Sequence, residues 1–350
     1  MTSVQKHPDN ISASVIVVNF NRKDLLRRCL ASLSQQRDVA FEIIVVDNGS
    51  TDGGPQIIET EFGSGFPPLT LIRNAENRGF CAANNQGIAR ARAPFIALLN
   101  NDAEADPGWL AALLSAFDGR PEIGMAASKI LVYEDPRRID KAGHLIYFDG
   151  QNRGRGSGEW DQGQYDQVEE VLWPDGCAAM YRKAMLDEIG GFDEDFFAYA
   201  DDAELGMRAR MAGWGCLYIP TAVVRHHRGS TLGVLSTQRL ELIERNRILL
   251  AAKTFPWSLL WLNGAFFLAR IGAGIWAAAR GRGEVGRFPG LHGKLRVAWA
   301  IIRADMAALP LLPRMLRKRS SIKRRLTSSQ LKSLLFRFRI PLRRLMEESI

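Results

Sequence analysis

The residues best suited to chemistry in this chain are acidic and stand where short apolar runs end. Asp47 closes the β-branched run FEIIVVD and opens the turn-rich segment NGSTD. A carboxylate only accepts hydrogen bonds, so Asp47 suits the imide N–H of a pyrimidine base. The same aspartate also fits an ordinary turn between a strand and a helix that it caps. From this segment alone, both interpretations of Asp47 stay open.

A second polar segment, LLNND, ends another apolar run. Its oxygen-bearing side chains are Asn100, Asn101 and Asp102. Ions such as Mg²⁺ or Mn²⁺ prefer oxygen ligands, take one or two protein carboxylates and complete their shell with phosphate oxygens and water. The segment also fits a polar turn before a helix that opens near Pro107. It therefore predicts either half of a divalent-metal site or a plain turn.

The third acidic segment, FFAYADDAEL, places two adjacent aspartates beside aromatic residues at the start of a predicted helix. Repulsion between Asp201 and Asp202, together with partial burial, raises a carboxyl pKa and favours one of them as a general base. An acid at a helix N-terminus also complements the helix dipole, and Asp201 fits that role. Asp202 is therefore the candidate base.

Helical patterns alternate with these strand-like runs and set their place in the fold. We predict strands near 14–19, 41–47, 69–73 and 95–99, and helices near 24–35, 55–61 and 79–92. This alternation indicates an α/β fold with a mainly parallel sheet and helices on both faces. Ligands of such sheets bind beyond the carboxyl ends of the strands. We therefore expect Asn19, Asp47 and residues 100–102 along one rim.

The pattern loosens between about 130 and 171, where GQNRGRGSG at 150–158 predicts a mobile loop. Regular patterns then return. They predict helices at 182–189, 201–212 and about 235–253, and strands near 217–219 and 222–225.

The charge distribution bears on the class of partner. The 350 residues carry a net charge of +8, of which residues 311–350 contribute +10, so the first 310 sum to −2. Because the basic residues avoid the main body, the pattern disfavours nucleic acid as a partner. The four cysteines form no C-x-x-C pair, so the sequence signals neither a structural zinc site nor a redox dithiol. Free thiols of this kind fit a reducing cytosol. With no apolar signal core in residues 1–12, we expect a cytoplasmic protein.

Two nucleotide-binding classes are disfavoured by missing glycines. A dinucleotide oxidoreductase needs G-x-G-x-x-G after the first strand, whereas this chain has NFNR at 19–22. A P-loop NTPase needs G-x-x-x-x-G-K-[ST], which is also missing from the sequence.

Five motifs in a fixed order make residues 12–255 resemble an inverting family 2 glycosyltransferase of the GT-A fold, closest to the bacterial rhamnosyltransferase-like branch. They are SVIVVNFN at 14–21, VDNGSTD at 46–52, NRGFCAANNQG at 77–87, LLNND at 98–102, and GGFDEDFF at 190–197 followed by DDAEL and the stretch 208–214. Single motifs of this kind are weak, but their order and spacing are specific.

The resemblance implies roles for particular residues. Asp202 takes the place of the catalytic base that deprotonates the acceptor hydroxyl, and Asp102 with His226 would hold Mg²⁺ or Mn²⁺; His227 is the alternative to His226. The nucleotide would contact Asn19, Asp47, Asn77, Asn100 and Asn101. Asn100 departs from the family's D-x-D pattern, and a neutral amide binds a hard cation less well, which leaves metal-independent chemistry open.

The implied activity is the transfer of one sugar from a nucleotide-diphosphate sugar, dTDP-rhamnose or a similar hexose donor, to a hydroxyl of a glycan acceptor. The resemblance implies inversion at the anomeric carbon, a lipid-linked acceptor and a place in cell-surface polysaccharide biosynthesis. The chain has no Q-x-x-R-W motif, so we expect a non-processive enzyme. The alternative is an inactive or regulatory nucleotide-sugar-binding module docked at the membrane, which Asn100 favours.

The carboxy-terminal third is apolar and basic. Residues 257–279 are numerous enough to span a bilayer, but Arg270 stands near their middle, where it costs about 3 kcal/mol on insertion scales. We expect a glycosyltransferase domain at 12–255, a helical region at 256–312 and a basic tail at 313–350. We expect the last two to associate with an anionic membrane surface at the inner face of the cell membrane. The alternative is a helical pair packed on the catalytic domain, followed by a disordered tail.

Overall fold

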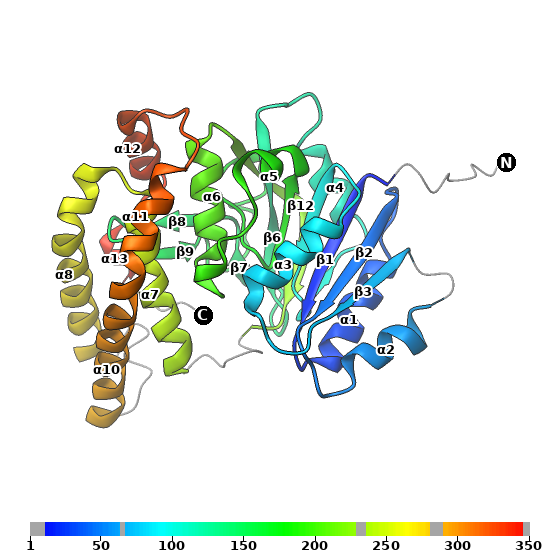
Figure 1. Cartoon of the computed structure of the whole chain (residues 1–350), viewed down its shortest axis with the longest axis horizontal. Coiled ribbons are helices and arrows are strands. Elements are labelled where there is room, and N and C mark those ends of the chain that lie inside the picture. Colours follow the sequence, from blue (N-terminus) through cyan, green and yellow to red (C-terminus); the bar gives the residue numbers. More distant parts are fainter. Residues whose placement is uncertain (1–10, 64–66, 229–235, 281–289, 346–350) are drawn as a thin grey trace.

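The computed structural model describes residues 11–63, 67–228, 236–280 and 290–345 (Figure 1). Its first strands form a parallel sheet in the order β4-β1-β2-β3, as the alternation of strands and helices predicts. The strands are β1 (Ala13–Asn19), β2 (Phe41–Asp47), β3 (Leu69–Arg73) and β4 (Phe95–Leu99). Asn19 and Asp47 are register partners at the ends of β1 and β2, so their side chains share the carboxyl rim of the sheet.

Helices cover both faces of this sheet because its strands are apolar on both sides. Val15 and Val45 pack in one hydrophobic cluster and Ile16 and Ile44 in another, as the alternation of side chains along a strand requires. The helices of this half are α1 (Lys23–Ser34), α2 (Gly54–Glu61), α3 (Gly79–Arg90) and α4 (Trp109–Ser115).

The second half of the sheet is mixed. It continues from β4 in the order β11-β6-β12-β10, with β11 antiparallel to both of its neighbours. A single long strand, β12, replaces the two short strands predicted at 217–225, and its pairing is irregular between Ile219 and Val223, where Pro220 lies. The strands are β5 (Ala103–Ala105), β6 (Ile123–Val132), β7 (Ile139–Lys141), β10 (Glu169–Glu170), β11 (Ala178–Arg182) and β12 (Gly215–His226).

A small hairpin, β8 (His144–Ile146) and β9 (Asn152–Gly154), lies inside the segment where the sequence pattern loosens. The loop predicted at 150–158 therefore includes a strand. The hairpin carries His144 into the interior of the protein, where its side chain is buried.

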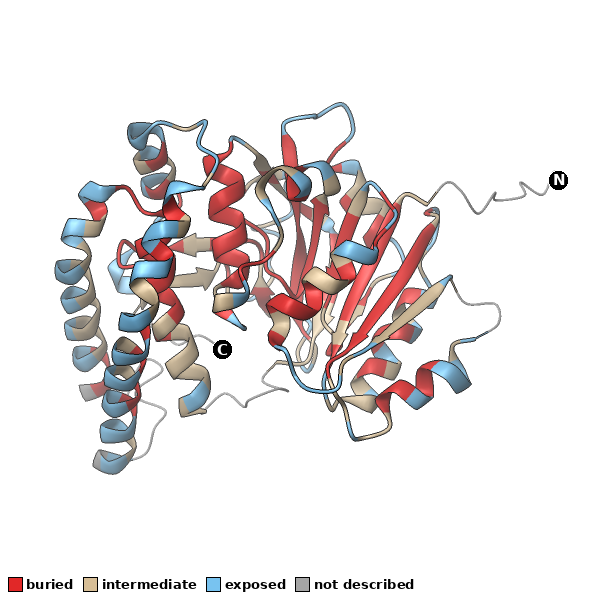
Figure 2. Cartoon of the chain, viewed as in Figure 1, coloured by how far each residue is buried: buried red, intermediate tan, exposed pale blue. Residues whose placement is uncertain are grey.

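Helix α6 (Asp201–Met211) is buried along its entire length (Figure 2). It lies close to Trp173 because residue 206 is glycine: a Cβ there would collide with the Cβ of Trp173. It packs against α5 (Lys183–Ile189) and α7 (Thr237–Thr254), and the 3-10 helix η1 (Glu194–Phe196) precedes it in the chain. This packing fixes Asp202 in the first turn of a rigid element.

The remaining helices lie at the end of the molecule away from β3 (Figure 1). Within 313–350, the described residues form helices rather than a disordered tail, and Ile146 of β8 exchanges backbone hydrogen bonds with Phe338 and Ile340. The helices are α8 (Trp257–Ala279), α10 (Gly290–Ala308), η2 (Leu309–Leu311), α11 (Leu312–Ser320), α12 (Ser328–Arg337) and α13 (Leu342–Leu345).

Candidate functional site

The amide and carboxylate side chains at the ends of three neighbouring strands form one chain of hydrogen bonds. Asn19 Nδ2 donates to Asp47 Oδ1 at 3.0 Å, and Asn101 Nδ2 donates to Asn19 Oδ1 at 2.7 Å. All three side chains are buried. The predicted rim therefore exists, and it joins Asp47 to the polar segment after β4.

Asp47 and Asp52, at the two ends of the turn after β2, accept hydrogen bonds from different backbone groups. Asp47 Oδ2 accepts the backbone N–H of Ser50 at 3.0 Å, which fixes the orientation of its carboxylate at the rim. Asp52 accepts the backbone N–H groups of Lys23 at 2.7 Å and Gly54 at 3.0 Å. Asp52 thus caps the starts of two helices. Asp47 caps neither of them, so its carboxylate stays available at the rim.

Asn77 contacts the row of hydrogen-bonded side chains only indirectly, through Asn48, the residue after Asp47. Its Oδ1 accepts the Asn48 side chain at 2.9 Å and the Gly79 backbone N–H at 2.9 Å. Its side chain is exposed. Asn77 therefore braces the loop at the start of α3 beside Asp47, at the edge of the rim rather than inside it.

Asp102 and His226 face each other, as the resemblance implies. His226 ends β12 opposite Ala103 of β5, and its Nε2 stands 3.4 Å from Asp102 Oδ1. Its Nδ1 is 2.7 Å from Asp140 Oδ2. His227, the alternative, stacks on Tyr133 instead, with 3.5 Å between ring centroids.

The electrostatics around His226 suit a divalent cation. Burial raises the pKa of Asp140, but Lys141 and His226 outweigh it and hold that pKa below its usual range, so an ionised Asp140 accepts the Nδ1–H. Nε2 is thereby turned toward Asp102. A carboxylate and an imidazole whose far nitrogen is held by a second carboxylate form a common donor set for such ions. The residues present therefore fit the metal that the resemblance implies.

Asp202 contacts a buried group of residues that the sequence did not single out. Its Oδ2 lies 3.3 Å from the Gly176 backbone N and 3.5 Å from His144 Nε2. The same His144 nitrogen is 2.8 Å from Asp175 Oδ2, and Lys141 Nζ lies 2.5 Å from that oxygen. A cationic side chain and an imidazole therefore surround the two carboxylates.

The carboxylates of this group differ in proton affinity. Burial raises the pKa of Asp202, and raises that of Asp201 well above its usual value. For Asp175, Lys141 and His144 outweigh burial and hold the pKa well below its usual value. Of the two carboxyl groups with a raised pKa, Asp202 is the one that contacts the Gly176 N–H and His144, and a raised proton affinity is what a general base requires.

His144, Asp175 and Asp202 also have ligand types that could hold a metal ion. The ammonium of Lys141 already stands against Asp175, however, and supplies positive charge to this group. The environment therefore favours the pair Asp102 and His226 as the cation position.

Residues 175–177, just before β11, join the two groups. The Cys177 carbonyl accepts the Asn100 backbone N–H at 2.8 Å, and Asp175 Oδ1 accepts the Cys177 N–H at 2.9 Å. The Gly176 N–H points to Asp202. A continuous path of polar contacts thus runs from the rim at Asn100 to Asp202.

The loop before Asp202 has an unusual backbone held by one side chain. Phe197, Tyr199 and Ala200 have φ values of 63°, 68° and 54°, a region that L-residues seldom adopt. Asn246 Nδ2 of α7 lies 2.9, 2.8 and 2.7 Å from the carbonyl oxygens of Phe196, Ala198 and Tyr199. Asn246 therefore positions the entry to α6.

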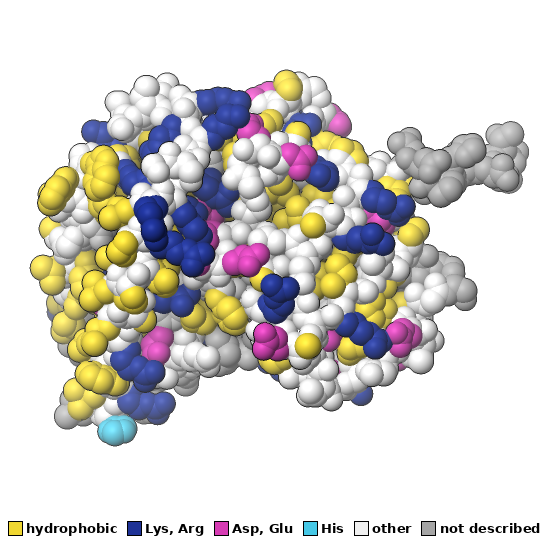
Figure 3. All heavy atoms as spheres, viewed as in Figure 1, with side chains coloured by type: hydrophobic (Ala, Val, Ile, Leu, Met, Phe, Trp, Pro, Cys, Tyr) yellow, Lys and Arg dark blue, Asp and Glu magenta, His cyan; other side chains and the backbone are white. Residues whose placement is uncertain are grey.

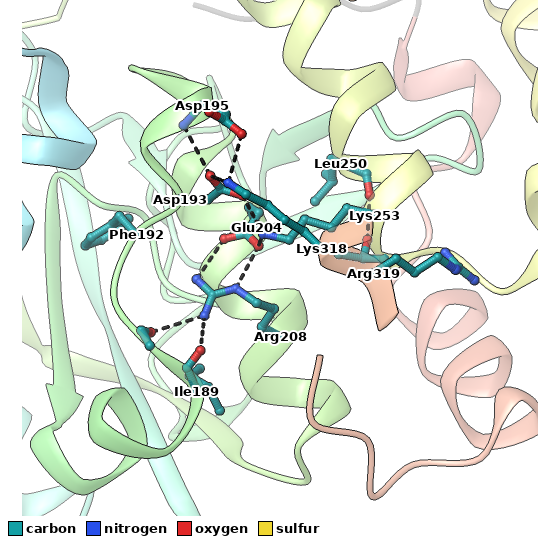
Figure 4. A network of polar contacts seen from close by, with 12 residues as sticks. Ile189, Phe192, Asp193, Asp195, Glu204, Arg208, Leu250, Lys253, Lys318 and Arg319 are labelled. Atoms are coloured by element: carbon teal, nitrogen blue, oxygen red, sulfur yellow. Dashed lines mark hydrogen bonds and ion pairs between the residues drawn. The ribbon is translucent and has the colours of Figure 1, made fainter. Parts of the chain in front are cut away.

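An ion-pair network holds the base of the same loop (Figure 4). Lys253 Nζ of α7 lies 2.6 Å from Asp193 Oδ2 and 2.5 Å from Glu204 Oε1 of α6. Lys318 of α11 also contacts Asp193, and Arg208 pairs with Glu204 at 2.7 Å. Helices α7 and α11 thus fix α6 from the side opposite the sheet.

Four of the five site residues that the sequence missed come from segments without periodic pattern, and the fifth, Asn246, lies in the predicted helix near 235–253. Only Asp175 offers a signal, because it follows the short apolar stretch VLWP much as Asp47 closes the run FEIIVVD. They are Asp140, Lys141, His144, Asp175 and Asn246.

Comparison with known proteins places the chain in a family. The family model described as glycosyl transferase family 2 matches residues 14–190. An N-acetylglucosaminyl-diphospho-decaprenol L-rhamnosyltransferase of Mycobacterium tuberculosis is 30% identical over 240 residues, which cover 63% of this chain and 77% of the relative. A pre-mycofactocin glycosyltransferase of the same species is 27% identical over 225 residues, covering 63% and 44%.

Solved structures support the fold. GalNAc-T7, crystallised with UDP, GalNAc and Mn²⁺, aligns with a TM-score of 0.54 at 15% identity over 69% of this chain and 51% of that one. TarS of S. aureus aligns with a TM-score of 0.51 at 17% identity over 93% and 55%. The chain thus spans about half the length of these two structures. It belongs to glycosyltransferase family 2, has the GT-A fold and is a rhamnosyltransferase-like glycosyltransferase.

Proposed function

We propose that this glycosyltransferase moves one hexose from a nucleotide-diphosphate sugar to a hydroxyl of a lipid-linked glycan, with inversion at the anomeric carbon. The observation that carries the proposal is the path of polar contacts between two groups of residues. At one end are hydrogen-bond acceptors suited to a nucleotide, and at the other is a buried carboxylate that can act as a general base. Asp47 and Asn19 lie at the first end, and Asp202 lies at the second.

In this proposal the rim binds the donor. Asp47 Oδ1 and Oδ2 already accept hydrogen bonds from Asn19 and Ser50, so the carboxylate is fixed in orientation and remains able to accept a base imide N–H. Asn100 and Asn101 follow at the end of β4, where the diphosphate of a donor bound to Asp47 would extend.

Asp102 and His226 would hold Mg²⁺ or Mn²⁺. When bound, the metal would supply positive charge that stabilises the leaving diphosphate. Asp140 keeps His226 oriented for this role, and the neutral Asn100 makes the protein's own contribution to metal affinity smaller than a second carboxylate would.

Asp202 would act in the transfer itself. The acceptor hydroxyl gives its proton to an Asp202 carboxylate oxygen as its own oxygen bonds to C1 of the sugar. The C1–oxygen bond to the diphosphate breaks on the opposite face, so the configuration inverts in one displacement. The Gly176 N–H and His144 fix the direction of the carboxylate, and no covalent intermediate is needed.

The similarity to the mycobacterial rhamnosyltransferase supports the finer assignments. By its name, that protein transfers L-rhamnose to a sugar on a diphospho-decaprenol lipid. We propose dTDP-rhamnose or a similar hexose donor, a lipid-linked glycan acceptor at the inner face of the cell membrane, and one sugar added per encounter during cell-surface polysaccharide synthesis.

A binding panel followed by a transfer assay tests the proposal. At 100 times its dissociation constant, a donor stabilises the protein by about 2.7 kcal/mol, which a thermal shift resolves. We expect dTDP-rhamnose with Mg²⁺ or Mn²⁺ to raise the melting temperature more than UDP- or GDP-sugars do, and a polyprenyl-diphosphate glycan to become labelled. If no nucleotide sugar shifts the transition, the proposal fails.

The second candidate, a nucleotide-sugar-binding module without activity, is favoured by Asn100 alone. Such a module would bind the donor but would neither transfer its sugar nor hydrolyse it. The enzyme, in contrast, releases nucleoside diphosphate when the acceptor or water attacks. A coupled diphosphate-release assay with and without acceptor distinguishes the two.

A further inference from the structure

The longest apolar helix of the protein is attached to the catalytic domain by its charged residue. Trp257–Ala278 of α8 is the one described segment long and apolar enough to cross a membrane, with a mean hydropathy of 1.3. Arg270, near its middle, lies 2.6 Å from Asp149 Oδ2 and 2.7 Å from both carboxylate oxygens of Glu244. Both acids are buried.

Further contacts from the same face of α8 follow this attachment. Asn263 Nδ2 donates to the Phe148 carbonyl at 3.3 Å, and the Phe266 ring stands 5.1 Å from the Phe148 ring. If α8 crossed a bilayer, these groups would have to separate from the domain, leaving Asp149 and Glu244 buried with less compensating charge. The helix therefore lies along the domain by this face.

The opposite face of α8 is apolar and exposed. Trp261 is 85% exposed, Leu268 69% and Ile275 66%. The outer face of α10 and η2 continues the pattern with Leu295, Trp299, Ile302, Met306 and Leu309, while small residues of α10 face inward. Apolar side chains gather over these helices at the end of the molecule away from β3 (Figure 3). An exposed apolar surface of this kind needs a partner.

The charges beside this surface identify the class of partner. Exposed cations on α10 and α11 include Lys294, Arg296 and Arg317. Across the described residues between 257 and 320, Asp305 is the one acid, and it lies 3.7 Å from Arg247. Apolar side chains rich in tryptophan, flanked by cations, match the interface of an anionic bilayer.

We propose that the outer faces of α8, α10 and η2 form a docking surface for an anionic lipid bilayer, with α8 lying along the membrane instead of crossing it. This surface is independent of the catalytic groups, so it goes beyond the proposed transfer reaction. It would bring the enzyme to any acceptor carried by a lipid.

Vesicle sedimentation with the full chain tests the proposal without any donor. We expect at least tenfold more protein in the pellet with vesicles of phosphatidylglycerol and phosphatidylcholine than with phosphatidylcholine alone, and release by high salt. A Trp261→Glu/Trp299→Glu variant should lose this binding and keep the wild-type melting temperature. Trp160→Glu, which changes an exposed tryptophan outside these helices, is the matched control and should bind normally.

Four outcomes would overturn the proposal. They are no binding to either vesicle, equal binding of the double variant, retention in the pellet at alkaline carbonate as for a spanning helix, and a wild-type dimer that the double variant converts to monomer. The last would assign the surface to a second copy of the chain. Because none of these measurements involves sugar transfer, their failure is separate from failure of the proposed function.

Discussion

The two ends of the polar path are built by different kinds of local structure. At the donor end, Asn19 and Asp47 end neighbouring parallel strands as register partners, and Asn101 follows a third strand beside them. At the acceptor end, Asp202 on a buried helix meets His144 of a hairpin and Asp175 of a loop. The first arrangement is set by short-range pattern, and the second by tertiary packing.

This difference explains what the sequence could predict. The strands at 41–47, 69–73 and 95–99 and the rim at their ends follow from β-branched runs that end in polar residues. Strands β6 and β11 and the hairpin of β8 and β9 did not, because their residues carry no clear period and their pairing is antiparallel across distant segments.

Individual site residues divide in the same way. Asp202 could be proposed because two adjacent acids open a helix, but its partners could not, since Lys141 and His144 lie in a segment with no motif. Likewise Asn246 stands in an ordinary helical pattern, and only the three carbonyl oxygens around its amide reveal its task.

The largest effect is expected at the acceptor end. Asp202→Asn removes the base and should lower the transfer rate by about 10²–10⁴-fold, the usual contribution of general base catalysis. Asp201→Asn, an adjacent and equally buried carboxyl, is the control and should lose far less. Radiolabel transfer to the acceptor measures both, and equal losses would contradict a specific role for Asp202.

At the donor end, Asp140→Asn should weaken metal binding by about 10–100-fold, because an amide no longer holds His226 as a carboxylate does. Titration of Mn²⁺ in the presence of donor measures it. Asp106→Asn, which weakens the partly buried pair with Arg225, is the control. An unchanged Mn²⁺ titration would show that His226 is not a ligand.

The loop between the two ends gives a smaller and more selective effect. Asn246→Leu removes the amide that lies against three carbonyl oxygens and should lower kcat by about tenfold, which corresponds to about 1.4 kcal/mol in the barrier. The dissociation constant of the donor should stay the same. A general structural defect would instead weaken donor binding together with kcat. Asn263→Leu, which loses one amide contact far from this loop, serves as the control.

The smallest effect concerns stability and its dependence on pH. Burial raises the folded-state pKa of Asp202 above its unfolded value of about 3.9, so the folded wild type loses stability as pH rises through that raised value. The amide that replaces this carboxyl in Asp202→Asn does not titrate. In thermal melting, the difference in stability between Asp202→Asn and wild type should therefore shift in favour of the variant as pH rises from 4 to 8. A shift in favour of wild type over that range would contradict the raised pKa.

Calorimetric titration of the donor into Asp47→Asn, Asp102→Asn and Asp202→Asn proteins, with Mn²⁺ present, tests the division of the site most directly. We predict that the first two variants bind the nucleotide sugar at least tenfold more weakly, while Asp202→Asn binds it as wild type does and fails only in transfer. If Asp202→Asn loses donor affinity as strongly as the others, or Asp102→Asn retains it, the division into a donor end and an acceptor end is wrong.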